Sequence, residues 1–140
     1  MTDNEVTTIP SKHGVSITLD RLASMAVSKG LLIFARIDHA KGAADVGLPL
    51  RPTQLLIFGN PKGGTPLMQD RQIAGLDLPL HALAWQDEAE RVWLSYCPGS
   101  VIAARHGLTP TSQAAVEAID KGMAMLCALA AGGDARPEIP

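Results

Sequence analysis

The sequence predicts an α+β fold, a two-layer sandwich in which a mainly antiparallel sheet is covered on one face by helices. Two kinds of segment lead to this prediction. Short runs rich in β-branched residues, or alternating between apolar and polar, are typical of strands, and longer runs with a helical apolar period are typical of helices. Their order along the chain is strand, helix, strand, strand, a hairpin and a long helix. This order, β-α-β-β-β-β-α with short extra helices, indicates the two layers.

The first three elements follow from residue type and period. Residues 6–9 are all β-branched, which predicts a strand. Residues 18–29 place apolar side chains on one helical face, so we expect a helix with Thr18 as its N-cap and Gly30 at its end. Alternating apolar residues predict a strand over 31–38, whose second face becomes polar toward its end.

The middle of the chain combines an apolar run with a segment rich in glycine and proline. Residues 40–46 are expected to form a short helix, and the apolar run 53–58 predicts a central strand. Residues 59–66 contain three glycines and two prolines, so we expect a loop there. A helix is expected to begin near Leu67, with Thr65 as its N-cap.

A β-hairpin is expected next. Residues 80–86 and 91–96 read as strands, and the polar residues 87–90 between them have the length of a hairpin loop. The pairing would bring Trp85 and Trp93 near each other.

The last helix is expected between Thr109 and Gly132. From Met123 onward almost every residue in it is apolar, and such a helix must be covered on more than one side. We therefore expect a two-fold symmetric homodimer. The alternative is that the short helices near Ala40 and Val101 cover the second side within one chain.

Composition narrows the class of protein. The 140 residues are 46% hydrophobic and 19% charged, enough for a packed core, and 12 basic against 14 acidic residues form no basic stripe. We therefore expect no nucleic-acid partner. The sequence contains no apolar run near the roughly 20 residues that cross a bilayer, which predicts a cytoplasmic protein with no membrane partner. Residues 1–133 are expected to form a single domain, and residues 134–140 a flexible tail.

Four segments carry a family resemblance. These are FARIDH at 34–39, LLIFGNP at 55–61, GTPLM at 64–68 and LPL at 78–80. In order and spacing they resemble the bacterial and archaeal family called domain of unknown function 302. The resemblance implies a TATA-binding-protein-like α+β sandwich and assigns no activity.

The segment between the central strand and the next helix is the first candidate ligand site. Free backbone N–H groups at a helix start, with a lysine beside them, would seat a small anion. The alternative is a tight turn with Thr65 as a helix cap, because the lysine precedes the glycines and the pattern is not a Walker loop. The candidate residues are Asn60, Lys62, Gly63, Gly64 and Thr65.

Strand ends supply the remaining candidates. Asp38 and His39 could support acid–base chemistry, or Asp38 could simply cap the next helix. Cys97 follows Tyr96 at a strand end just before a helix start, which would lower the pKa of its thiol, or it could be an inert buried residue. His81 shares a strand face with an aromatic residue. If the strand ends border one cleft, His39, His81 and Cys97 should open onto it together.

These observations predict a homodimeric small-ligand-binding or regulatory domain with a small anionic or polar ligand. The alternative is a small enzyme that uses Asp38, His39 and Cys97 in a cleft at the sheet edge. No motif identifies a cofactor, a metal site or a catalytic residue.

Overall fold

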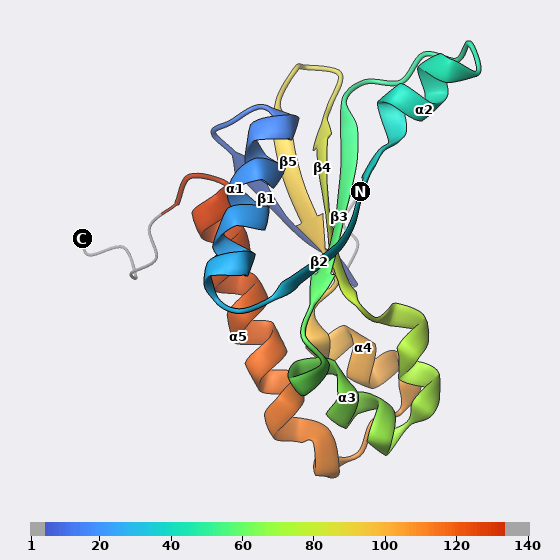
Figure 1. Ribbon diagram of the computed structural model, residues 1–140, viewed down its shortest axis with the longest axis vertical. Coiled ribbons are helices and arrows are strands. Elements are labelled where there is room, and N and C mark those ends of the chain that lie inside the picture. The colour runs from blue at the N-terminus through green and yellow to red at the C-terminus, as the bar shows by residue number, and fades with distance from the viewer. Residues whose placement is uncertain (1–4, 134–140) are drawn as a thin grey trace.

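The computed structural model describes residues 5–133 (Figure 1), so the predicted tail at residues 134–140 lies outside the described part. The elements follow in this order: β1 (Thr7–Ser11), α1 (Val15–Ser28), β2 (Leu32–Asp38), α2 (His39–Asp45), β3 (Thr53–Gly59), α3 (Pro61–Asp70), the 3₁₀-helix η1 (Gln72–Asp77), β4 (Leu80–Gln86), β5 (Val92–Tyr96), α4 (Gly99–His106), the 3₁₀-helix η2 (Pro110–Ser112) and α5 (Gln113–Ala130).

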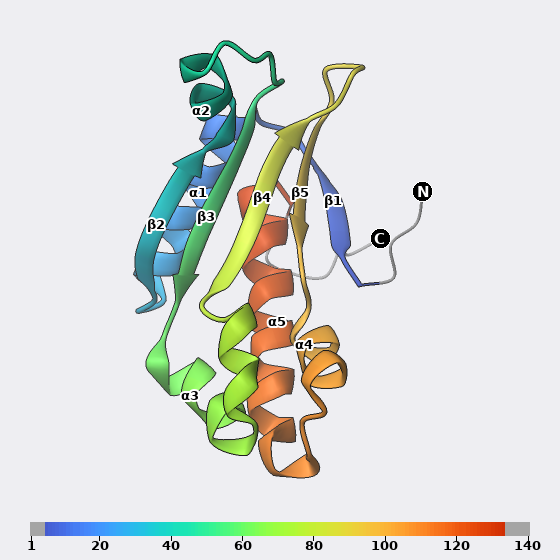
Figure 2. The ribbon, with the colours of Figure 1, turned by 90° about the vertical axis from the view of Figure 1, so that its right-hand side faces the viewer.

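The strands form one sheet in the order β1-β5-β4-β3-β2, and every neighbouring pair is antiparallel. Helices α1 and α5 lie side by side behind this sheet when it is viewed from its open face (Figure 2). The predicted α+β fold, with an antiparallel sheet covered on one face by helices, is therefore confirmed.

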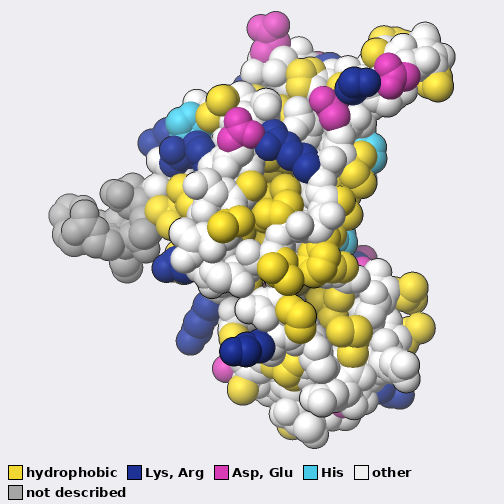
Figure 3. Space-filling view, in the orientation of Figure 1, with side chains coloured by type: hydrophobic (Ala, Val, Ile, Leu, Met, Phe, Trp, Pro, Cys, Tyr) yellow, Lys and Arg dark blue, Asp and Glu magenta, His cyan; other side chains and the backbone are white. Residues whose placement is uncertain are grey.

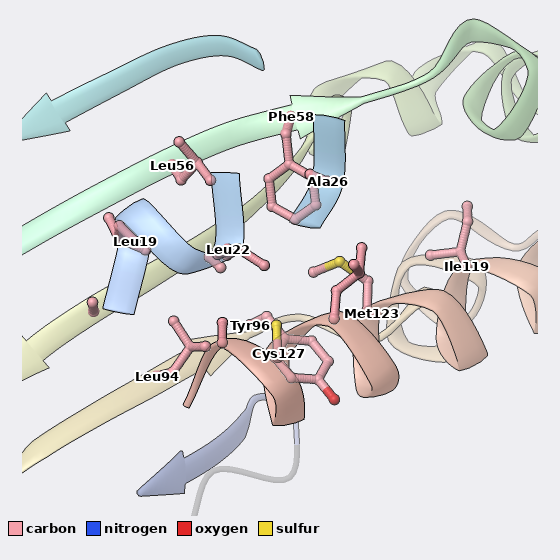
Figure 4. Close-up of a cluster of buried hydrophobic side chains, with 14 of the residues drawn as sticks. Leu19, Leu22, Ala26, Leu56, Phe58, Leu94, Tyr96, Ile119, Met123 and Cys127 are labelled. Atoms are coloured by element: carbon pink, nitrogen blue, oxygen red, sulfur yellow. The ribbon is translucent and has the colours of Figure 1, made fainter. Parts of the chain in front are cut away.

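The core lies between the sheet and these two helices (Figure 4). Leu56 and Phe58 of β3 are fully buried against Leu19 and Leu22 of α1, because alternate residues of a strand point to the same face. Met123 of α5 is also buried and points into the same interior as Phe58 (Figure 4).

Helix α5 is covered within one chain, because it packs against α1, α3 and α4. The short helix expected near Val101 is α4, and it provides part of this cover. The short helix expected near Ala40 is α2, which packs against β3 instead. The intrachain alternative therefore holds for the helix near Val101, and the apolar character of the last helix gives no argument for a homodimer.

Helix α1 begins three residues earlier than expected. Gly14 is its N-cap, and the hydroxyl of Thr18 donates a hydrogen bond of 2.8 Å to the Gly14 carbonyl oxygen from inside the first turn. A threonine that bonds the carbonyl four residues back is compatible with a helix interior, so the hydroxyl did not mark the cap. Gly30 has a φ of +83° after the helix, as expected for a helix end.

The second face of the sheet carries no helix of the α1–α5 layer. Leu55 and Ile57 of β3 point to this face. The register places Leu55 between Ile37 of β2 and Leu83 of β4, and Ile57 between Ala35 of β2 and His81 of β4. Trp85 follows Leu83 on the same face of β4. These side chains range from half-buried to exposed. In Figure 1 the face looks to the right, between α2 above and α4 below, and the outline in Figure 3 is hollowed on that side. We call this surface, with Ile37 at its β2 edge, the open sheet face.

None of the helices between residues 5 and 133 combines the length and apolarity needed to cross a membrane.

Candidate functional site

The main candidate is an apolar cleft of about 370 Å³ between α3, α5, the end of β3 and the segment that leads into β4. Its walls include Phe58 and Leu80 from the sheet, Met68 from α3, Leu78 and Met123. Figure 3 shows hydrophobic side chains gathered over the middle of the molecule, between β2 and α3. The cleft is thus a hydrophobic cavity that opens to the surface.

The glycine-rich segment is the beginning of helix α3, not a loop. Pro61 is the first helical residue, which suits a residue without an N–H group, and Asn60 is the N-cap. The Asn60 side chain accepts a hydrogen bond of 2.9 Å from the Lys62 N–H. The Asn60 carbonyl oxygen accepts bonds from Gly63 and Gly64 at 2.9 and 3.0 Å. These N–H groups are therefore engaged inside the protein, which weakens the anion interpretation.

Four of the five residues expected around that anion site line the cleft. These are Asn60, Gly63, Gly64 and Thr65; Lys62 is exposed and is not part of the lining. Thr65 lies inside α3 and is not its N-cap. The segment thus borders a cavity, and that cavity is apolar rather than a seat for an anion.

The other expected site residues lie apart from the cleft. Asp38 of β2 pairs with Gln54 of β3, and His81 of β4 pairs with Ile57 of β3. Gln54 and Ile57 are three residues apart, which is about 10 Å along the strand. Asp38 and His81 are therefore separated both along β3 and across it. Asp38 accepts a hydrogen bond of 2.9 Å from the Lys41 N–H at the start of α2, so the capping alternative is confirmed. His39 is the first residue of that helix.

Tyr96 and Cys97 lie at the end of β5, and neither lines the cleft. Tyr96 is buried, and burial raises the pKa of its phenol. Burial also raises the pKa of the Cys97 thiol, and the charge of nearby Arg105 opposes this only in part. The helix start therefore does not produce the expected low-pKa thiolate. The structure does not bring His39, His81 and Cys97 onto the cleft.

Two groups of residues that shape the cleft and its surroundings were not predicted from the sequence. One is the α5 wall of the cleft, Ala118, Gly122 and Met123. The available signal was a glycine inside an otherwise strong helix, which often has a packing reason. The other is a polar cluster in which Asp77 accepts hydrogen bonds from both Arg105 and His106. Nothing local in the sequence links residues that are 28 or 29 positions apart.

Comparison with known proteins gives relatives with a named activity. A protein of Brucella suis biovar 1 (strain 1330), named Fluoride-specific ion channel FluC 1, is 45% identical over 130 residues, which cover 93% of this chain and 51% of that protein. A Brucella melitensis protein named Fluoride-specific ion channel FluC 2 is also 45% identical, over 93% of this chain and 48% of its own length. The chain spans about half the length of the curated relatives it matches.

These names overturn several expectations from the sequence. Ion channels are membrane proteins, so the relatives contradict a cytoplasmic protein with no membrane partner. They equally contradict a homodimeric small-ligand-binding or regulatory domain, and its alternative, a small enzyme. The expectation rested on apolar runs in this sequence alone, which carry no information about the half of these relatives that this chain does not match.

A solved structure shares the fold. The crystal structure of an uncharacterized conserved protein DUF302 from Bacillus stearothermophilus superimposes with a TM-score of 0.79 at 16% sequence identity, over 92% of this chain and 99% of that one. The sequence also matches the family described as Domain of unknown function DUF302 over residues 7–126. With most of its length matched, and with the fold of a solved member, this chain belongs to the DUF302 family.

Proposed function

We propose that this chain is the α+β part of a fluoride-channel assembly and works in contact with a membrane-embedded part that conducts fluoride. The observation that carries the proposal is the 45% identity over 93% of this chain to proteins named as fluoride-specific ion channels. Identity at this level over nearly the whole chain indicates common descent of the matched part.

The matched lengths of this chain and its relatives indicate which part of the assembly conducts fluoride. The matched part of the Brucella suis relative is 51% of that protein, and the DUF302 match covers residues 7–126 of this chain. The same fold accounts for 99% of the Bacillus stearothermophilus chain, which supports its being a unit of its own. We therefore assign fluoride conduction to the half of the relatives that this chain does not match.

The open sheet face is the surface that we assign to the contact with this channel half. Strand β3 is apolar on both faces, with Leu56 and Phe58 inward and Leu55 and Ile57 outward. An antiparallel strand with one solvated face normally alternates apolar with polar residues. By strand spacing, the patch measures on the order of 300 Å², comparable to the largest apolar patch on an ordinary monomer, which is often functional.

Binding to the unmatched half of the Brucella suis relative tests the proposal. That half would be reconstituted in lipid nanodiscs, and this chain added in solution while binding is followed by interferometry. We expect saturable binding and, in liposomes, a changed rate of fluoride efflux at a fluoride electrode when this chain is added. Absence of both effects would refute the assignment.

A pair of variants tests the surface. Leu83→Glu places a charge at the centre of the open sheet face and should weaken binding at least tenfold. Val27→Glu is the matched control, because Val27 is 58% exposed on α1, on the opposite side of the sheet. Thermal melts of both variants establish that they are folded. Equal binding by the two would place the contact elsewhere.

A further inference from the structure

The chemistry of the cleft favours an apolar occupant. Both oxygens of Asn60 and the N–H groups of Gly63 and Gly64 already take part in hydrogen bonds at the start of α3. The remaining walls are mainly hydrophobic side chains such as Phe58 and Leu78. A stable buried water needs two to four polar partners, and an anion needs free donors. The cleft therefore favours an apolar occupant.

The size of the cleft excludes a helix. Three turns of an α-helix, about 16 Å long and about 10 Å wide, occupy roughly 1,200 Å³. The cleft holds about 370 Å³. One water takes up about 30 Å³ in the liquid, and a methylene group is of similar size, so the cleft has room for about twelve methylene groups.

The walls also suit a flexible linear chain. Gly63 and Gly64 on one side and Ala118 and Gly122 on the other leave a space between α3 and α5. A Cβ atom built at Gly63 or Gly122 would meet nothing within 4 Å, so this space is open. Met68 also lines the cleft, and methionine adapts its shape to irregular apolar partners.

The mouth of the cleft is apolar as well. Phe34 of β2 is 52% exposed and lines the cleft, and the half-buried Leu31 lines it as well. An apolar rim continuous with an apolar interior lets a hydrocarbon chain enter without passing a polar barrier.

We infer that the cleft binds one unbranched acyl chain of about twelve carbons, with its polar head outside. The inference stands independently of the proposed channel function, because it concerns this chain alone. A free fatty acid and a membrane lipid both supply such a chain.

Calorimetric titration with saturated fatty acids of six to sixteen carbons, each below its micelle concentration, tests the inference. Affinity should rise with each added carbon up to about twelve and then level off, because further methylenes remain in water. Lysophosphatidylcholine with a twelve-carbon chain forms the second arm. Tighter binding of dodecanoate identifies the free acid as the source, and tighter binding of the lysolipid identifies a membrane lipid.

Variants on α5 locate the binding. Gly122→Leu fills the cleft and should weaken dodecanoate binding at least tenfold. Ala124→Leu is the matched control, because Ala124 is exposed on the same helix and does not line the cleft. Melting temperatures establish that both variants fold. Equal affinity in the two, no binding at all, or affinity that keeps rising to sixteen carbons would overturn the inference.

Discussion

Trp85 and Trp93 lie directly opposite each other in β4 and β5, with their ring centroids 6.3 Å apart and their planes inclined by 30°. The indole N–H of Trp85 donates to Ser95 Oγ at 2.9 Å, and that of Trp93 donates to Asp87 Oδ2 at 2.8 Å. Both N–H groups are engaged within the hairpin, and the two rings pack together on the open sheet face, with the Arg91 guanidinium 5.0 Å from the centre of the Trp93 ring.

The Trp93–Asp87 bond predicts a measurable change in acidity. The hydrogen bond from Trp93, followed by the backbone N–H of Arg91, lowers the pKa of Asp87 below its ordinary value. Trp93→Phe keeps an aromatic ring and removes the donor, so the pKa of Asp87 should rise toward the ordinary range. A carboxyl-detected NMR titration measures it.

The control for this prediction is Trp85→Phe. Trp85 donates to Ser95 and makes no bond to Asp87, so this variant should leave the pKa of Asp87 unchanged. If both variants shift the pKa equally, the cause is loss of ring packing and not loss of the Trp93 bond.

The hairpin was predictable because its information is local. Alternating residues on both sides of a short polar loop defined the strands, and the neighbouring tryptophans followed from the pairing. The start of helix α3 was predicted near Leu67, six residues too late, for an equally local reason. Two prolines and two glycines weaken a helix. Pro61 occupies the first position, where a proline is tolerated, and packing of Leu67 in the core stabilises the helix despite the internal Pro66.

The cleft was not predictable from the sequence, because its walls come from distant segments. Phe58, Leu78 and Met123 meet only after the sheet, α3 and α5 have packed together. The apolar run 53–58 predicted that Phe58 belongs to a central strand, but no sequence pattern indicates that an open space lies beside its side chain. The separation of Asp38 from His81 likewise depends on the register of β2 and β4 against β3.

The polar cluster at η1 predicts a pH dependence of stability. Burial alone would raise the pKa of Asp77, but the hydrogen bonds and charges of His106 and Arg105 outweigh it and lower the pKa. A carboxylate with a depressed folded-state pKa stabilises the fold above its unfolded pKa of about 3.9, and the contribution is lost as pH falls through the folded value. Asp77→Asn should therefore cost about 1–2 kcal/mol at pH 7 and flatten the loss of stability in acid.

Urea unfolding from pH 7 to pH 3 measures this effect. Asp45→Asn is the control, because Asp45 is 63% exposed in a surface pair with Lys41 and such pairs contribute little. Two outcomes would contradict a stabilising role for the cluster. One is a similar loss in the free energy of unfolding in both variants, and the other is an unchanged dependence of that free energy on pH below 7 for Asp77→Asn.

The two cysteines should differ in their rate of alkylation, and both should react more slowly than an unhindered thiol. Burial raises the pKa of Cys127 to about 12, and its side chain is fully inaccessible. At pH 8 roughly one molecule in ten thousand would carry that thiolate.

Cys97 is half-buried with a raised pKa, so it should react slowly with iodoacetamide while the protein is folded. Intact mass spectrometry should show one slow adduct on the folded protein and two after denaturation. Cys97→Ser should abolish the adduct of the folded form. Reaction of Cys97 faster than free cysteine would contradict the raised pKa and restore an activated thiolate at this helix start.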